Sequence, residues 1–139
     1  AIVRPLSRRL PLSVSEGKVG FVVSRPGHFV VEFDGKQALP LLIFANPPER
    51  NVPAKGDPGV IYYGPGDHQA GQIRVRSGQT LYLAPGAFVR GAIVAEDADD
   101  VTIRGRGVLY GGDYPRGAFD DAKFVMLTRC RRARVEGIT

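Results

Sequence analysis

The chain has 139 residues, of which 43% are hydrophobic, and it carries 19 Lys and Arg against 14 Asp and Glu, a formal net charge of +5. This apolar content is compatible with packed cores and argues against a disordered chain. No stretch approaches the roughly 18 consecutive apolar residues of a membrane-spanning helix, so no membrane partner is predicted.

Short apolar runs dominate the first segment, residues 2–46. The run at residues 19–23 ends at a Pro-Gly turn, and residues 28–33 alternate up to Asp34-Gly35, a strong hairpin signal. A third run, at residues 39–45, contains a proline, which places it at a sheet edge or at the start of a strand. The pattern predicts a small antiparallel β-unit.

A change of composition marks the predicted domain boundary. Residues 46–59 hold four prolines and two glycines, which is typical of a linker with a restricted backbone. We therefore predict a β-sandwich-like domain at residues 1–53, including the Pro-rich linker, and a second domain at residues 54–139.

Short strands punctuated by glycine follow in the second domain. They are expected at residues 60–63, 73–75, 80–83, 88–89, 92–95, 101–103, 108–110 and 124–127. Alternation directs one set inward: Leu81, Leu83, Val101, Ile103, Val125 and Leu127. It directs another set outward: Thr80, Tyr82, Thr102 and Arg104.

An internal repeat runs through the same region. Residues 98–105 are echoed by residues 130–137, and a register of this size with a strand followed by Gly predicts stacked β-coils. An antiparallel sandwich gives similar strand density, but strands that recur without hairpin-length partners favour a wound parallel helix. Because the second copy stops close to Thr139, we expect the opening part of a longer protein. Its uncapped coil end would favour homo-oligomers.

Several phrases carry a family resemblance. They are residues 63–68 (Tyr-Gly-Pro-Gly-Asp-His), 73–87, 89–93 and 101–107. These phrases resemble the start of the right-handed parallel β-helix in glycoside hydrolases of the polygalacturonase and dextranase type, within the pectate-lyase-like superfamily. Residues 44–49 resemble the end of the β-sandwich that precedes the helix in some members.

The resemblance implies an all-β fold: a small amino-terminal antiparallel β-sandwich-like unit followed by the first coils of a right-handed parallel β-helix. It also implies a polysaccharide or oligosaccharide partner and an extracellular or periplasmic location. Members cleave glycosidic bonds with clustered aspartates on later coils, helped by a His and basic residues. The family's catalytic phrases Asn-Thr-Asp, Gly-His-Gly and Arg-Ile-Lys do not occur here.

We therefore expect an amino-terminal fragment of a polysaccharide-degrading glycoside hydrolase whose catalytic coils lie outside this chain, and we assign no catalytic residue. Two alternatives stay open. One is a non-catalytic scaffold or carbohydrate-binding module that self-associates. The other is a hydrolase whose site forms between subunits.

Candidate substrate contacts lie in and beside the loop that follows Tyr110. Tyr110 and Tyr114 are of a type that stacks on sugar rings, and Asp113, Asp120 and Asp121 are the acids of that loop. Adjacent residues on an extended segment point to opposite faces, so Asp120 and Asp121 make a poor acid–base pair.

Neither a metal nor a cofactor is predicted. Asp97, Asp99 and Asp100 crowd one turn but lack the glycine and closing Glu of an EF-hand loop, so they are interpreted as solvated turn acids. The two histidines and the single cysteine are too widely separated for a zinc site. Cys130 is predicted to be a buried structural thiol.

The charge pattern bears on partners. Arginine supplies most of the positive charge, and its planar guanidinium favours carboxylates and phosphates, which points to an acidic polysaccharide. The basic residues are scattered singly without interleaved aromatics, a pattern that disfavours nucleic acid.

Overall fold

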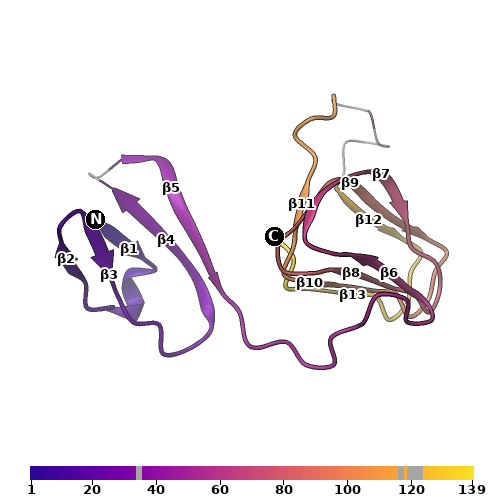
Figure 1. Ribbon diagram of the computed structural model, residues 1–139, viewed down its shortest axis with the longest axis horizontal. Coiled ribbons are helices and arrows are strands. Elements are labelled where there is room, and N and C mark those ends of the chain that lie inside the picture. Colours follow the sequence, from indigo (N-terminus) through magenta and orange to yellow (C-terminus); the bar gives the residue numbers. More distant parts are fainter. Residues whose placement is uncertain (34–35, 116–117, 119–123) are drawn as a thin grey trace. The chain divides into compact units, whose positions relative to one another are not determined.

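The computed structural model describes residues 1–33, 36–115, 118 and 124–139, and it is all-β. The chain divides into two units, Ala1–Pro48 (unit 1) and Glu49–Thr139 (unit 2), so the division falls inside the Pro-rich stretch (Figure 1). In the described part of the chain, the only helical element is the 3-10 turn η1 (Leu6–Arg8). None of its helices has the length and apolar character to cross a membrane.

Unit 1 contains two small antiparallel sheets. The larger has the order β1 (Ile2–Arg4), β4 (Gly27–Phe33) and β5 (Lys36–Ala45), and the smaller pairs β2 (Ser13–Ser15) with β3 (Lys18–Gly20). The antiparallel pairing predicted for this segment is confirmed, and the proline-containing strand β5 is an edge strand as expected. The predicted turn at Asp34-Gly35 lies outside the described residues.

The core of unit 1 is small and includes one paired charge. Val3, Phe29 and Val31 are buried together. Beside them Glu32 is also buried, and Arg4 Nε donates to its Oε1 at 2.7 Å. A buried carboxylate is costly without such a donor, so the pair fixes β1 on β4.

Unit 2 consists of two parallel sheets. Sheet 1 has the order β6 (Val60–Tyr63), β8 (Thr80–Leu83), β10 (Thr102–Gly105) and β13 (Arg134–Glu136). Sheet 2 is built on β9 (Ala87–Glu96), which pairs with β7 (Gly66–Arg74), β11 (Val108–Tyr110) and β12 (Val125–Thr128). Along the chain the strands pass from one sheet to the other, except that β11 and β12 both join sheet 2 (Figure 1).

The repeat found in the sequence matches the strand register at two places in unit 2, whereas the other parallel pairs have offsets of 20–22 positions. Thr102 pairs with Arg134 in sheet 1, and Ile93 pairs with Val125 in sheet 2, both at an offset of 32 positions. An isolated parallel bridge between Asp99 and Arg131 keeps the same offset.

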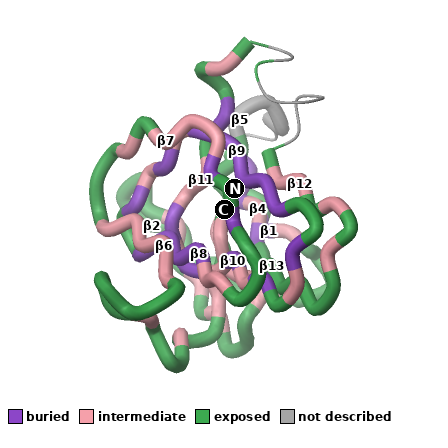
Figure 2. The backbone as a smooth tube through the Cα atoms, turned by 90° about the vertical axis from the view of Figure 1, so that its right-hand side faces the viewer, coloured by how far each residue is buried: buried purple, intermediate pink, exposed green. Residues whose placement is uncertain are grey.

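The core of unit 2 lies between these sheets (Figure 2). Leu81, Leu83, Val101 and Ile103 are buried there, as alternation predicts, and Val125 packs against them. Leu127 was also expected to be inward, but it is 36% exposed. Among the described strands β12 pairs with β9 alone, so its other edge has no neighbour that would cover Leu127.

A close backbone approach follows strand β10. The Leu83 carbonyl accepts hydrogen bonds from the amides of Arg106 at 2.9 Å and Gly107 at 3.0 Å. Gly105 has a φ of 139°, and a Cβ at this position would lie 1.9 Å from the Leu83 oxygen. Only glycine therefore lets the chain turn here while β10 stays paired with β8.

We expect Gly105→Ala to destabilise unit 2 by about 4 kcal/mol, because the added methyl would collide with backbone that cannot move independently. Gly78→Ala is the matched control, since Gly78 also has a positive φ of 72° but has open space around it. Gly78→Ala should lower the free energy of unfolding by about 1 kcal/mol, because alanine in the left-handed conformation is less stable than glycine by about this amount. Urea unfolding followed by tyrosine fluorescence measures both, because all five tyrosines lie in unit 2. Equal losses for the two variants would contradict the close approach.

Candidate functional site

Three of the five predicted contact residues gather around one arginine on sheet 2. Tyr110 of β11, with Asp113 and Tyr114 just after it, surrounds Arg90 of β9. We call the following group the Arg90 cluster: Asp67, Phe88, Arg90, Tyr110, Asp113 and Tyr114. The other two predicted residues, Asp120 and Asp121, lie outside the described residues.

Strand register brings the cluster together. Phe88 and Arg90 flank the buried Val89 on β9, so both point away from the core. Tyr110 is the register partner of Arg90 in β11, and Asp67 is the partner of Phe88 in β7. Phe88 and Arg90 are not predicted from the sequence. Their spacing of two residues on one strand is a signal that they share a face, but their partners come from other strands.

Two carboxylates hold the Arg90 guanidinium. Its Nε donates to Asp67 Oδ1 at 2.9 Å and its Nη2 to Asp67 Oδ2 at 3.1 Å, while Nη1 donates to Asp113. The hydroxyl of Tyr114 donates to the Arg90 carbonyl at 3.2 Å. Hydrogen bonding from Arg90 lowers the pKa of Asp67, and the two carboxylates raise the pKa of Arg90.

Two aromatic rings complete the cluster. The rings of Phe88 and Tyr110 lie 5.2 Å apart, and Arg90 Cζ is 4.9 Å from the first centroid and 5.5 Å from the second. These distances are in the range of cation–π contacts. Tyr110 is 38% exposed, so part of its ring is free to meet a ligand.

The cluster is chemically suited to binding. Its polar atoms are fixed by one another, and an exposed aromatic edge lies beside them, the combination that orients small ligands. One arginine and two aspartates give it a formal charge of −1, which disfavours an anionic ligand. Asp67, whose pKa is lowered, is ionised at neutral pH and has no proton to donate.

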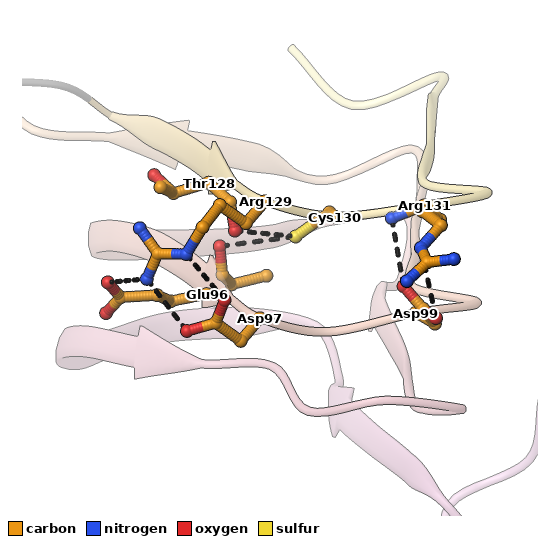
Figure 3. Close-up of polar contacts among 8 residues, drawn as sticks. Glu96, Asp97, Asp99, Thr128, Arg129, Cys130 and Arg131 are labelled. Atoms are coloured by element: carbon orange, nitrogen blue, oxygen red, sulfur yellow. Dashed lines mark hydrogen bonds and ion pairs between the residues drawn. The ribbon is translucent and has the colours of Figure 1, made fainter.

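A second polar group occupies the turn between β9 and β10. The acids interpreted as solvated turn acids are at least partly exposed, and each is also paired with an arginine of the equivalent turn, 32 positions later. Figure 3 shows the pairs of Asp97 and Asp99. The nitrogen–oxygen distances are 2.5 Å for Arg129–Asp97, 3.8 Å for Arg131–Asp99 and 2.6 Å for Arg132–Asp100. The sequence itself places these acids and arginines 32 positions apart, so the repeat offset could have predicted the ion pairs.

The backbone of this turn repeats as well. Asp97 and Arg129 have φ values of 50° and 52°, and both are left-handed. Cys130 lies between the paired charges, and its thiol contacts the carbonyls of Ala95 and Thr128, each at 3.4 Å (Figure 3). The thiol packs against the core but is only partly buried. These side-chain pairs therefore join the two equivalent turns.

Tyr82 forms a third polar group, on the outer side of sheet 1. Although alternation directs it outward, Tyr82 is only 1% exposed. Its hydroxyl donates to Glu49 Oε2 at 2.9 Å, and its ring lies 5.5 Å from that of Tyr62. Arg104, the register partner of Tyr82 in β10, lies 3.8 Å from Glu49 Oε1. Burial, followed by the hydrogen bond to Glu49, raises the pKa of Tyr82 to about 12.

Metal binding has no support within the described ranges, where no group of three or more His, Cys, Asp or Glu side chains is placed to hold an ion. Comparisons with models of known families, with curated proteins and with solved structures found no match.

The raised pKa of Tyr82 predicts a loss of stability at high pH. An unfolded tyrosine ionises near pH 10, so the neutral phenol stabilises the fold fully below that pH, and this contribution is lost as the pH rises towards 12. We expect Tyr82→Phe to lower stability at pH 7 by about 1–3 kcal/mol through the lost hydrogen bond, and to flatten the decline above pH 10. Tyr62→Phe is the control, because it also removes one hydroxyl and keeps the ring, 5.5 Å from the ring of Tyr82. Urea unfolding from pH 7 to pH 12 measures both effects, and an unchanged slope in Tyr82→Phe would contradict this assignment.

Proposed function

We propose that unit 2 is the opening part of a right-handed parallel β-helix in a protein of the polygalacturonase and dextranase type, and that it binds a saccharide through the Arg90 cluster. The fold part of this proposal is supported by strands that pass between two parallel sheets and pair at offsets of 20–22 positions among the earlier strands and 32 positions in the later pairs. Connections between parallel strands are almost always right-handed, which supports the handedness.

The proposal that unit 2 binds a saccharide is supported by the arrangement of side chains around Arg90. Sugar rings present apolar C–H faces and a rim of hydroxyl groups. The exposed part of the Tyr110 ring suits the apolar face, while Asp67 and Asp113 offer carboxylate oxygens in fixed positions to the hydroxyls. Because the cluster is assembled before a ligand arrives, little side-chain entropy is lost on binding.

The same geometry favours binding over cleavage. Glycoside hydrolysis needs one carboxyl that carries a proton and a second that is ionised. In the Arg90 cluster both carboxylates accept hydrogen bonds from the arginine, and the pKa of Asp67 is lowered. A hydrolase site formed between subunits, with Asp113, Asp120 or Asp121, is the competing proposal.

We expect the chain to be retarded in affinity gels that contain a neutral polysaccharide such as dextran, and Tyr110→Ala to weaken this retention about tenfold through the lost stacking surface. Phe44→Ala is the matched control, because Phe44 is a similarly exposed aromatic of unit 1. The same polysaccharides are assayed for released reducing ends.

Retention that is equal in the wild-type chain and Tyr110→Ala would contradict the proposed role of the cluster. Release of reducing ends that disappears in the triple variant Asp113→Asn, Asp120→Asn, Asp121→Asn would favour the hydrolase instead.

A further inference from the structure

A cavity of about 400 Å³ lies near the far end of sheet 2 from the Arg90 cluster. Its polar lining comes from Arg74, Arg76, Ser77, Glu96 and Asp97, above small buried apolar side chains. Asp67 lies near the start of β7 and Arg74 is its last residue, so the two places are separated by about 20 Å of strand. We call this feature the Arg74 cavity.

Two arginines on one face, Arg74 and Arg76, supply positive charge to the cavity wall. Arg74 and Arg76 flank the buried Val75, so both side chains point away from the core, with Cα atoms about 7 Å apart. Neither guanidinium forms an ion pair or a side-chain hydrogen bond with any residue in the described part of the chain. They differ in this from Arg90, whose donors are all directed at carboxylates in the cluster.

The two acids in the cavity wall share one arginine on their other side. Arg129 donates from Nη2 to Glu96 Oε1 at 2.8 Å and to Asp97 Oδ2 at 2.7 Å. With Arg129 included, three guanidinium groups and two carboxylates leave a formal charge of +1, and Arg74 and Arg76 are the two arginines without an ion pair among the described residues. Ser77 adds a donor, because its Oγ accepts the Asp99 amide at 3.0 Å and its own proton stays available.

We propose that the Arg74 cavity binds a small oxyanion, either the carboxylate of an acidic sugar or a sulfate group. A planar guanidinium can donate two parallel hydrogen bonds to two oxygens of such a group. Because Arg74 and Arg76 lie two residues apart on the same face, both can donate to one bound oxyanion. The volume is within the range of small-ligand pockets. This site is separate from the Arg90 cluster and does not depend on its function.

The arrangement that competes with a ligand is internal. Arg74 pairs with Val94 in the sheet register, so Arg76 follows beside Glu96, and a rotation of Arg76 would pair these two charges. In that case the cavity would close without a ligand. The experiment must therefore separate an oxyanion site from an internal ion pair.

The test is titration of the ¹⁵N-labelled chain with glucuronate and with sulfate, each against glucose and chloride at constant ionic strength. We expect saturable shifts of the amide signals of residues 74–77 and of the Arg74 and Arg76 Nε–H signals with at least one oxyanion. The double variant Arg74→Gln, Arg76→Gln should weaken this binding at least tenfold. The charge-matched control is Lys18→Gln, Arg25→Gln, whose two side chains lie exposed in unit 1.

A response to glucuronate, to sulfate or to both supports the site and identifies the group it accepts. No response to either, an equal response to chloride, or unchanged binding by the double variant would overturn it in favour of the internal pair. Tyr110→Ala should bind the oxyanion as the wild-type chain does, so failure of this site and failure of the saccharide proposal are separate results.

Discussion

Parallel pairing in a fixed register is the constraint on which the rest of unit 2 depends. It stacks equivalent side chains from successive strands, so that Leu81 lies on Ile103 inside the core. Outside the core the same register brings Tyr82 beside Arg104, and at the turn it brings Asp97 beside Arg129. Because the main-chain ladder sets all of these contacts, a shift of one residue would expose the core and separate every charge pair.

The register also decides what each arginine of sheet 2 can do. Arg90 lies opposite an aromatic residue and near two carboxylates, so it is held as a rigid part of a mixed polar and aromatic surface. Arg129 donates hydrogen bonds to Glu96 and Asp97, and these bonds join two turns. Arg74 and Arg76 line a cavity together with Glu96 and Asp97, but they form no ion pair with a described residue, and this is why we propose that they bind a ligand. Residue type alone does not separate these roles.

The sequence predicts those features that depend on local pattern. Alternation identifies Leu81 and Ile103 as core residues, and the repeat of residues 98–105 predicts the offset of 32 positions at which β10 pairs with β13. It does not predict the offsets of 20–22 positions between the earlier strands. The sequence does not predict the burial of Tyr82, because the covering residue, Glu49, comes from a segment without regular structure 33 positions earlier. The Arg90 cluster was found only in part, since its members come from different strands, and Asp120 and Asp121 stay predictions.

Disulfide trapping in a Cys130→Ser background tests the stacking register most directly. Thr102 and Arg134 are register partners on neighbouring parallel strands, whose spacing of about 4.8 Å is within the range that a disulfide can bridge. The account predicts that Thr102→Cys with Arg134→Cys forms an intrachain disulfide on mild oxidation. Thr102→Cys with Glu136→Cys, displaced by two residues along the strand, should stay reduced. Equal cross-linking of the two pairs, or none in the first, would contradict the register.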